Sequence, residues 1–97
     1  MKVVFEPAAL DELNRIFKWI EKDSPSAASA LIARIEAKVT RLAFPEFTYT
    51  GRPGLDAGTR ELIEYPYIIV YEVHEDRGEI VILAVVHGRQ NREERNE

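Results

Sequence analysis

The chain has no cysteine and only two histidines, His74 and His87, among its 97 residues. Without cysteine it can form no disulfide, no thiolate metal ligand and no cysteine nucleophile. Zinc sites in proteins take three or four ligands at characteristic spacings, and two isolated histidines do not supply such a set. We therefore expect no metal site.

The serines and glycines of the chain do not form the patterns that an enzyme would need. The three serines, at positions 24, 26 and 29, cluster where a helix should begin, which is typical of helix capping and not of a nucleophile elbow. Gly51, Gly54 and Gly58 match neither the dinucleotide-binding nor the phosphate-loop spacing. We therefore expect neither a serine or metal hydrolase nor a bound cofactor.

Long hydrophobic runs are also missing. No apolar run approaches the roughly 18 residues that a membrane helix needs. The segment Met1–Glu6 turns polar too early for a secretion signal, so we expect a cytoplasmic protein. The length predicts a single domain, residues 1–97, in which residues 88–97 form a polar tail.

Basic residues are too few for a free nucleic-acid binder. The net charge is −4 and the pI is about 5.2. The acidic excess falls in the second half, where residues 51–97 carry six arginines and ten carboxylates. Proteins that bind RNA or DNA alone usually have a basic surplus, because the release of counterions from the phosphates drives their affinity. The composition therefore favours a protein partner or a large assembly as the target.

Two amphipathic helices should follow a short apolar strand at residues 3–5. Pro7 suits the first position of a helix, and apolar residues at three-to-four spacing extend that helix to Lys22. Ser24 provides an N-cap before Pro25, and a second apolar stripe runs to about Ala43. So short a turn predicts an antiparallel helical hairpin whose apolar faces lie on a sheet.

After a loop at residues 44–57, the pattern changes to that of strands. Residues 59–65, 67–73 and 79–87 are rich in β-branched and aromatic types, and the nearly continuous apolar run in the last predicts a strand covered on both faces. The predicted fold is α+β, β-α-α-β-β-β, with the hairpin packed on a small, mainly antiparallel sheet. Tyr65, Tyr67 and Tyr71 are expected to pack, the alternative being that one of them lines a cleft.

Histidine and arginine side chains near strand ends are the candidate catalytic groups. RNA cleavage through the 2′-hydroxyl needs a base, a cation at the phosphate and an acid for the leaving oxygen. His87 could serve as the acid or the base, and Arg52, Arg60 and Arg89 could hold phosphate. The last strand of a meander ends beside the start of the middle strand, so we expect His87 and Arg60 to lie apart.

Four segments resemble the RelE/ParE toxin superfamily, and in particular its ParE branch of plasmid stabilization toxins. They are Ser24–Ala28, Gly58–Leu62, Tyr65–Tyr71 and Ile82–Arg89, and they occur in the family's order. The resemblance implies the toxin of a bacterial type II toxin–antitoxin system, kept silent in a hetero-oligomer by an antitoxin whose C-terminal segment wraps it. It also implies that the ParE-like branch poisons DNA gyrase, whereas the RelE-like branch cleaves mRNA on the ribosome.

The sequence departs from the nuclease pattern of the RelE-like branch. The resemblance places Ile68 where nuclease members carry an arginine and Glu72 where many members carry a second one, and no tyrosine matches their terminal tyrosine. His87 alone remains of that set. We therefore favour a ParE-like toxin that is not an enzyme and acts on gyrase. The alternatives are a ribosome-dependent mRNA endonuclease that uses His87, and a degenerate toxin that only binds its antitoxin.

Binding roles are predicted for four further side chains. Arg89 and Arg92 match the segment in which ParE-like toxins place their activity, so they are predicted to bind the target. Arg60 is a third candidate for target binding, and its alternative role is to pair with a nearby carboxylate. Trp19 is expected to pack against the core; if it is exposed, it becomes a contact for the antitoxin, because aromatic residues are enriched at interfaces.

Overall fold

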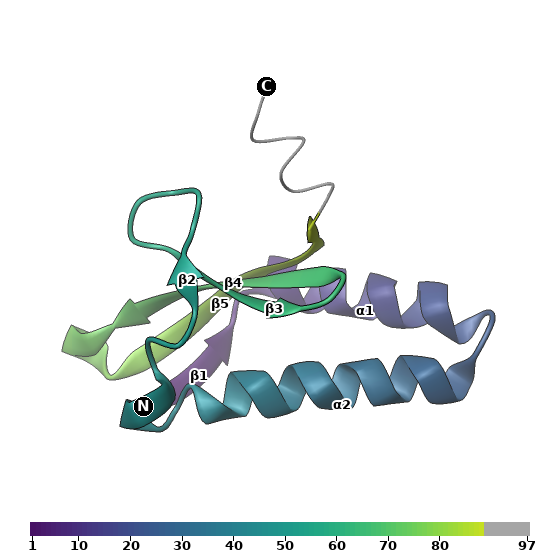
Figure 1. Ribbon diagram of the computed structural model, residues 1–97, viewed down its shortest axis with the longest axis horizontal. Coiled ribbons are helices and arrows are strands. Elements are labelled where there is room, and N and C mark those ends of the chain that lie inside the picture. Colours follow the sequence, from purple (N-terminus) through teal and green to yellow (C-terminus); the bar gives the residue numbers. More distant parts are fainter. Residues whose placement is uncertain (89–97) are drawn as a thin grey trace.

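Two helices cover one face of a five-stranded sheet in the computed structural model of the chain (Figure 1). The structure describes residues 1–88. The predicted α+β class and its order of elements are confirmed, with β2 as an additional short strand in the expected loop. The elements are β1 (Lys2–Phe5), α1 (Pro7–Glu21), α2 (Pro25–Arg41), β2 (Arg52–Pro53), β3 (Arg60–Glu64), β4 (Tyr67–His74) and β5 (Glu79–His87).

The helical hairpin forms where the sequence predicts it. Pro7 and Pro25 open the two helices, because a residue without an N–H leaves no donor unpaired at a helix start. The Ser24 hydroxyl caps α2 by accepting a hydrogen bond of 3.2 Å from the backbone N–H of Ala27. The two helices then run antiparallel and side by side (Figure 1).

The strands lie in the order β1-β5-β4-β3-β2. β5 is flanked by β1, to which it is parallel, and by β4, to which it is antiparallel, so it lies inside the sheet. Both helices lie on one face of the sheet, so the prediction of a strand covered on both faces is not confirmed. β3 pairs with β4 along its whole length, from Arg60 opposite Tyr71 to Glu64 opposite Tyr67. β2 pairs with only two residues of β3, Arg60 and Glu61.

Apolar side chains of both helices meet the inner face of β4 and β5. Because successive strand residues point to opposite faces, Ile69 and Tyr71 of β4 both face the helices. Glu12 of α1 accepts a hydrogen bond of 3.0 Å from the backbone N–H of Val85, next to the irregularity in the β4–β5 register. The buried cluster consists of Ala9, Leu31, Ile35, Val39, Leu42, Ile69, Tyr71, Ile80, Ile82 and Val85.

Two further properties belong to the described part of the chain. None of the helices within residues 1–88 is long and apolar enough to cross a lipid bilayer. Among the same residues, no three His, Asp or Glu side chains come together in a way that could hold a metal ion.

Candidate functional site

A shallow groove lies where the β3–β4 turn meets the end of β5. It has a volume of about 460 Å³ and holds the side chain of His87. Of the described residues, it brings together one imidazole, one guanidinium and a wall of aromatic and aliphatic side chains. The lining residues are Arg52, Ile63, Tyr65, Pro66, Tyr67, Ile68, His87 and Gly88.

Strand pairing sets the position of His87. The residue lies opposite Tyr67 in the β4–β5 pair, and the two rings meet edge to face with their centroids 5.7 Å apart. The backbone N–H of Gly88 donates a hydrogen bond of 2.9 Å to the carbonyl of Pro66 and so ties the end of β5 to the β3–β4 turn. His87 itself is exposed, so that its ring is accessible from the groove.

Arg52 enters the groove from β2 and already has a carboxylate partner. Its Nε lies 3.0 Å from Oε1 of Glu61, on the neighbouring strand. The Glu61 side chain is only 3% exposed, whereas that of Arg52 is 47% exposed. A carboxylate buried to this extent needs a cation beside it, so Arg52 balances the charge of Glu61 and the pair presents little net positive charge to the groove.

Arg60 lies away from the groove. It pairs with Tyr71, whereas His87 pairs with Tyr67, four residues along the same strand. Four strand residues span about 13 Å. The expectation that Arg60 and His87 lie apart is therefore confirmed, and a joint action of the two on one phosphate has no support in the fold.

The guanidinium of Arg60 holds the loop that precedes β2. It donates hydrogen bonds to the backbone carbonyl of Tyr49, at 3.1 Å, and to that of Gly51. Its charged carbon also lies 5.4 Å from the centre of the Tyr49 ring. These contacts give Arg60 an anchoring role for the loop, and its binding of a target remains a prediction.

Tyr71 fixes the same loop from the core. Its side chain is fully buried; the hydroxyl donates to the carbonyl of Thr48 at 3.0 Å and accepts from the N–H of Gly51 at 3.1 Å. A Cβ on Gly51 would lie 2.7 Å from that hydroxyl oxygen, so only glycine permits this approach. The loop that delivers Arg52 to the groove is thus held through Tyr71 and Arg60.

The three tyrosines of the strands have different roles. Packing is the observed role of Tyr71, and Tyr67 packs partly against the core. The packing prediction is wrong for Tyr65, which is 85% exposed because it follows the last residue of β3 and projects from the turn. Tyr65 and Tyr67 both line the groove, as the alternative reading allowed.

The prediction that Trp19 packs against the core is wrong. Leu13, Ile16 and Ile20 supply the core-facing stripe of α1, and Trp19 lies beside that stripe with 70% of its surface exposed. The ammonium of Lys22 lies 5.4 Å from the centre of its ring. Exposure leaves open the alternative role of Trp19, contact with an antitoxin, which remains a prediction.

Comparison with known proteins adds to this geometry. A sequence model described as the ParE toxin of the type II toxin–antitoxin system parDE matches residues 3–92. The chain belongs to the ParE toxin family. Among the relatives of this ParE-family toxin is the toxin candidate Y4kP of Sinorhizobium fredii, which is 44% identical over 84 residues, or 84% of this chain and 82% of that protein.

Solved structures share the fold of this ParE-family toxin. The chromosomal ParDE toxin–antitoxin system from P. aeruginosa contains a chain with a TM-score of 0.75 and 23% identity, over 90% of this chain and 95% of that one. The toxin–antitoxin complex RelBE2 from Mycobacterium tuberculosis gives a TM-score of 0.57 and 22% identity, over 89% and 95%. The toxin of a type II toxin–antitoxin system, expected from the sequence, is thus confirmed at the level of the family.

Two predicted target-binding residues of this ParE-family toxin, Arg89 and Arg92, lie outside the described residues 1–88. Their roles remain predictions. Within the groove, sequence reasoning had named His87 and Arg52 and allowed for a tyrosine. Ile68 was named only as the position of a nuclease arginine, and Ile63 was not found, because an aliphatic residue in a strand gives no sign of whether it lines a groove.

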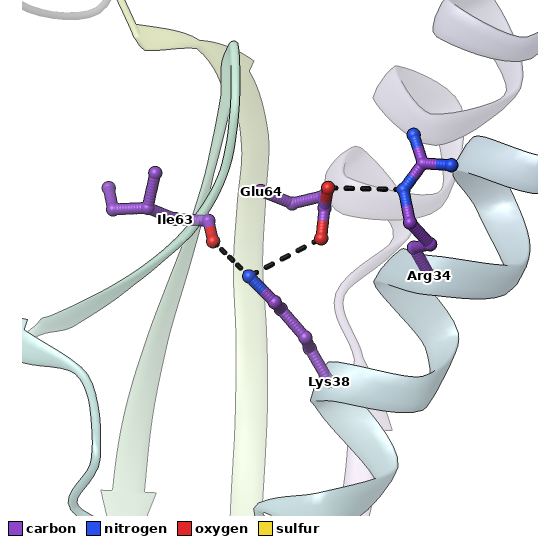
Figure 2. Close-up of polar contacts among 4 residues, drawn as sticks. All are labelled: Arg34, Lys38, Ile63 and Glu64. Atoms are coloured by element: carbon purple, nitrogen blue, oxygen red, sulfur yellow. Dashed lines mark hydrogen bonds and ion pairs between the residues drawn. The ribbon is translucent and has the colours of Figure 1, made fainter.

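A second polar cluster joins α2 of the toxin to β3 (Figure 2). The Glu64 carboxylate receives Arg34 Nε at 3.2 Å and lies 3.3 Å from Lys38 Nζ, which also donates to the carbonyl of Ile63. Burial tends to raise the pKa of Glu64, but the hydrogen bonds from Arg34 and Lys38 outweigh it and hold the pKa below its usual value. Glu64 therefore remains ionised in the folded protein at neutral pH.

Among the described residues, a second group with a shifted pKa is the phenol of Tyr49, in the loop before β2. The hydroxyl of Tyr49 donates a hydrogen bond to the carboxylate of Glu75. That hydrogen bond raises the pKa of Tyr49 above its usual value, because the ionised phenol could no longer donate. Tyr49 thus stays neutral and serves as a link between the loop and the end of β4.

Proposed function

We propose that this ParE-family toxin arrests bacterial growth by binding DNA gyrase, that it does not cleave mRNA, and that an antitoxin keeps it silent by binding it. We infer an antitoxin partner because the chain belongs to a toxin–antitoxin family and because the structural relatives are described as toxin–antitoxin systems. The choice of gyrase over the ribosome depends on the chemistry of the groove around His87.

The proposal rests on one observation: the arginine of that groove is already paired with a carboxylate. Cleavage of RNA builds negative charge on a phosphate, which needs a preorganised cation close to the reacting oxygens. Of the described residues, Arg52 is the arginine of the groove, and Glu61 lies 3.0 Å from it. Ile68, which stands where the resemblance places a nuclease arginine, contributes an aliphatic surface instead. Within residues 1–88, the groove therefore sets His87, an acid–base group, beside a guanidinium whose charge Glu61 already balances.

The same lining suits a protein target. Tyrosine is enriched in protein–protein interfaces, and charged residues are depleted at their cores. Tyr65 is 85% exposed and Ile63 is 38% exposed, so both can be buried by a partner. The net charge of −4 points the same way, because an acidic protein is repelled by free nucleic acid.

Mapping of mRNA ends during growth arrest tests this proposal. The chain is expressed from a tightly controlled promoter, and cellular mRNA is sequenced for new ends within reading frames. We expect growth arrest with intact mRNA, and we expect His87→Ala to arrest growth as fully as the original chain. His74→Ala is the matched control, since it removes the other histidine. His74 is the last residue of β4, whereas His87 lies opposite Tyr67, the first residue of that strand. New codon-spaced mRNA ends that disappear in His87→Ala alone would establish the nuclease instead.

A further inference from the structure

β1 lies at one end of the sheet and has a free edge. Among the described residues it pairs with β5 and with no other strand. An edge strand presents backbone N–H and C=O groups that can pair with another chain, and proline within the strand is one of the features that prevent this. The sequence of β1 is Lys-Val-Val-Phe, without proline. This edge can therefore accept a strand that matches it in hydrogen bonding and charge.

The backbone groups of Val3 and Phe5 face the free edge. The N–H groups of Lys2 and Glu6 donate to carbonyls in β5 and just before it, both at 2.9 Å. Residues of a strand bond alternately to the neighbour on one side and to the neighbour on the other. Val3 and Phe5, which lie at the alternate positions, therefore turn their N–H and C=O groups away from β5.

The side chains of this segment alternate between the two faces of the sheet. Val3 and Phe5 pack against the core beneath the helices, so Lys2, Val4 and Glu6 point to the opposite face. Glu6, the residue before α1, still has an extended backbone, with φ −64° and ψ 147°. The face turned away from the helices therefore carries a lysine, a valine and a glutamate in that order.

The lysine and the glutamate of this face are exposed, and both are available to a partner. Their backbones are four strand residues apart, or about 13 Å. Within residues 1–88, neither Lys2 nor Glu6 forms an ion pair. A second strand with the same sequence, running antiparallel to β1, would bring a glutamate opposite the lysine and a lysine opposite the glutamate.

One two-fold register satisfies both the backbone and these charges. In an antiparallel pair, residues that exchange hydrogen bonds stand directly opposite each other. Val3 and Phe5 of one copy must therefore face the same two residues of the other copy. Pairing Val3 with Phe5 places the symmetry axis at Val4 and sets Lys2 opposite Glu6 on both sides of it. Pairing like with like sets one of the charged residues opposite Val4 instead.

From the bonding pattern and the charges we propose that β1 is a contact surface between two copies of this chain, which pair antiparallel about a two-fold axis at Val4. The contact uses the same patch of both copies, as two-fold symmetry requires. Opposite charges directly across an antiparallel pair stabilise it, and like charges destabilise it. Pro7 has no N–H, so the pairing ends after Glu6. A contact this short is small beside a standard interface, so the dimer dissociates on dilution.

The paired strand does not reach the groove around His87. β1 extends along β5 only as far as Ile82, which lies opposite Phe5. His87 lies five residues further along β5, or about 17 Å. The contact between copies is therefore a property separate from the proposed action on gyrase.

Sedimentation equilibrium of the full chain, made by cell-free synthesis, tests the contact without requiring any toxic activity. Between about 10 µM and 1 mM the average mass should rise from that of one copy toward that of two. Lys2→Glu and Glu6→Lys each set like charges opposite each other on both sides of the axis, so each should raise the Kd of the dimer about tenfold or more. Lys18→Glu makes the same change of net charge on an exposed position of α1 and should leave the Kd unchanged.

An equimolar mixture of the two variants tests the register itself. Lys2→Glu presents two glutamates and Glu6→Lys presents two lysines, so a mixed pair regains both contacts between opposite charges. The mixture should therefore associate about as tightly as the original chain, although each variant alone associates weakly. A chain that stays monomeric over the whole range, reversals that act no more strongly than Lys18→Glu, or a mixture that recovers no association would each overturn the proposal.

Amide hydrogen exchange shows which edge the second copy covers. Exchange at Val3 and Phe5, whose N–H groups face the free edge, should slow as the concentration rises, whereas the N–H of Val4 faces β5 and should change less. Slower exchange at Val3 and Phe5 that is lost in Lys2→Glu supports the contact at β1. A dimer in which neither amide slows has its contact elsewhere and contradicts the proposal.

Discussion

Removal of the Tyr71 hydroxyl should loosen the loop that carries Arg52 into the groove. The hydroxyl is fully buried and makes two hydrogen bonds, one to the carbonyl of Thr48 and one from the N–H of Gly51. In Tyr71→Phe both backbone groups lose their partner, and each such loss costs about 1 kcal/mol net. We therefore expect the free energy of unfolding to fall by about 2 kcal/mol, a large part of the roughly 5 to 15 kcal/mol of an ordinary domain.

Urea and thermal unfolding measure this change. For a domain of this size, 2 kcal/mol corresponds to a fall in Tm of about 8 to 16 °C, and the dependence on urea should keep its slope while the midpoint moves. Tyr65→Phe removes the same atom from a side chain that is 85% exposed, and it should change stability by less than about 0.5 kcal/mol. If the two variants unfold at the same urea concentration, the loop is not held through Tyr71.

Two further perturbations test the helix–sheet contacts and the exposed aromatic side chain. The pKa of Glu64 is lowered in the folded protein, so its ionised form stabilises the fold above its usual pKa, and this contribution is lost as the pH falls through the lowered value. Glu64→Gln should therefore be less stable than the original chain at neutral pH, and the gap in unfolding free energy should close as the pH falls below the usual pKa of a glutamate; a gap that stays constant would contradict the ion pairs. Trp19→Ala should change the unfolding free energy by less than about 0.5 kcal/mol, since the ring is 70% exposed, and should weaken rescue of growth by a co-expressed antitoxin. Strong destabilisation with full rescue would place Trp19 in the core instead.

The helices and the main strands follow from local patterns in the sequence. Pro7, Ser24 and Pro25 mark the helix starts because proline and a capping hydroxyl act within one turn. The strand at Glu79–His87 is predicted to the residue, because its apolar run is bounded by polar residues on both sides. β2 was missed, since a strand of two residues has no periodicity to detect.

The site was less accessible to sequence reasoning because it depends on tertiary contacts. His87 and Tyr67 meet through the β4–β5 register, which the meander predicts. The pairing of Arg52 with the buried Glu61 depends on how the loop before β2 folds, and no local pattern encodes that. Trp19 was assigned to the core because its neighbour Ile20 faces the core. Successive residues of a helix are rotated by about 100°, however, and this rotation places Trp19 in solvent.

The central claim, that this ParE-family toxin acts on DNA gyrase, is tested most directly by a DNA-cleavage assay with purified gyrase. The chain is incubated with gyrase and supercoiled DNA beside the variants Arg89→Ala and His87→Ala. We expect cleaved DNA to accumulate with the original chain and with His87→Ala, and to be reduced in Arg89→Ala. Folded chain that binds an antitoxin, yields no cleaved DNA and cuts ribosome-bound mRNA only while His87 is present would contradict the account.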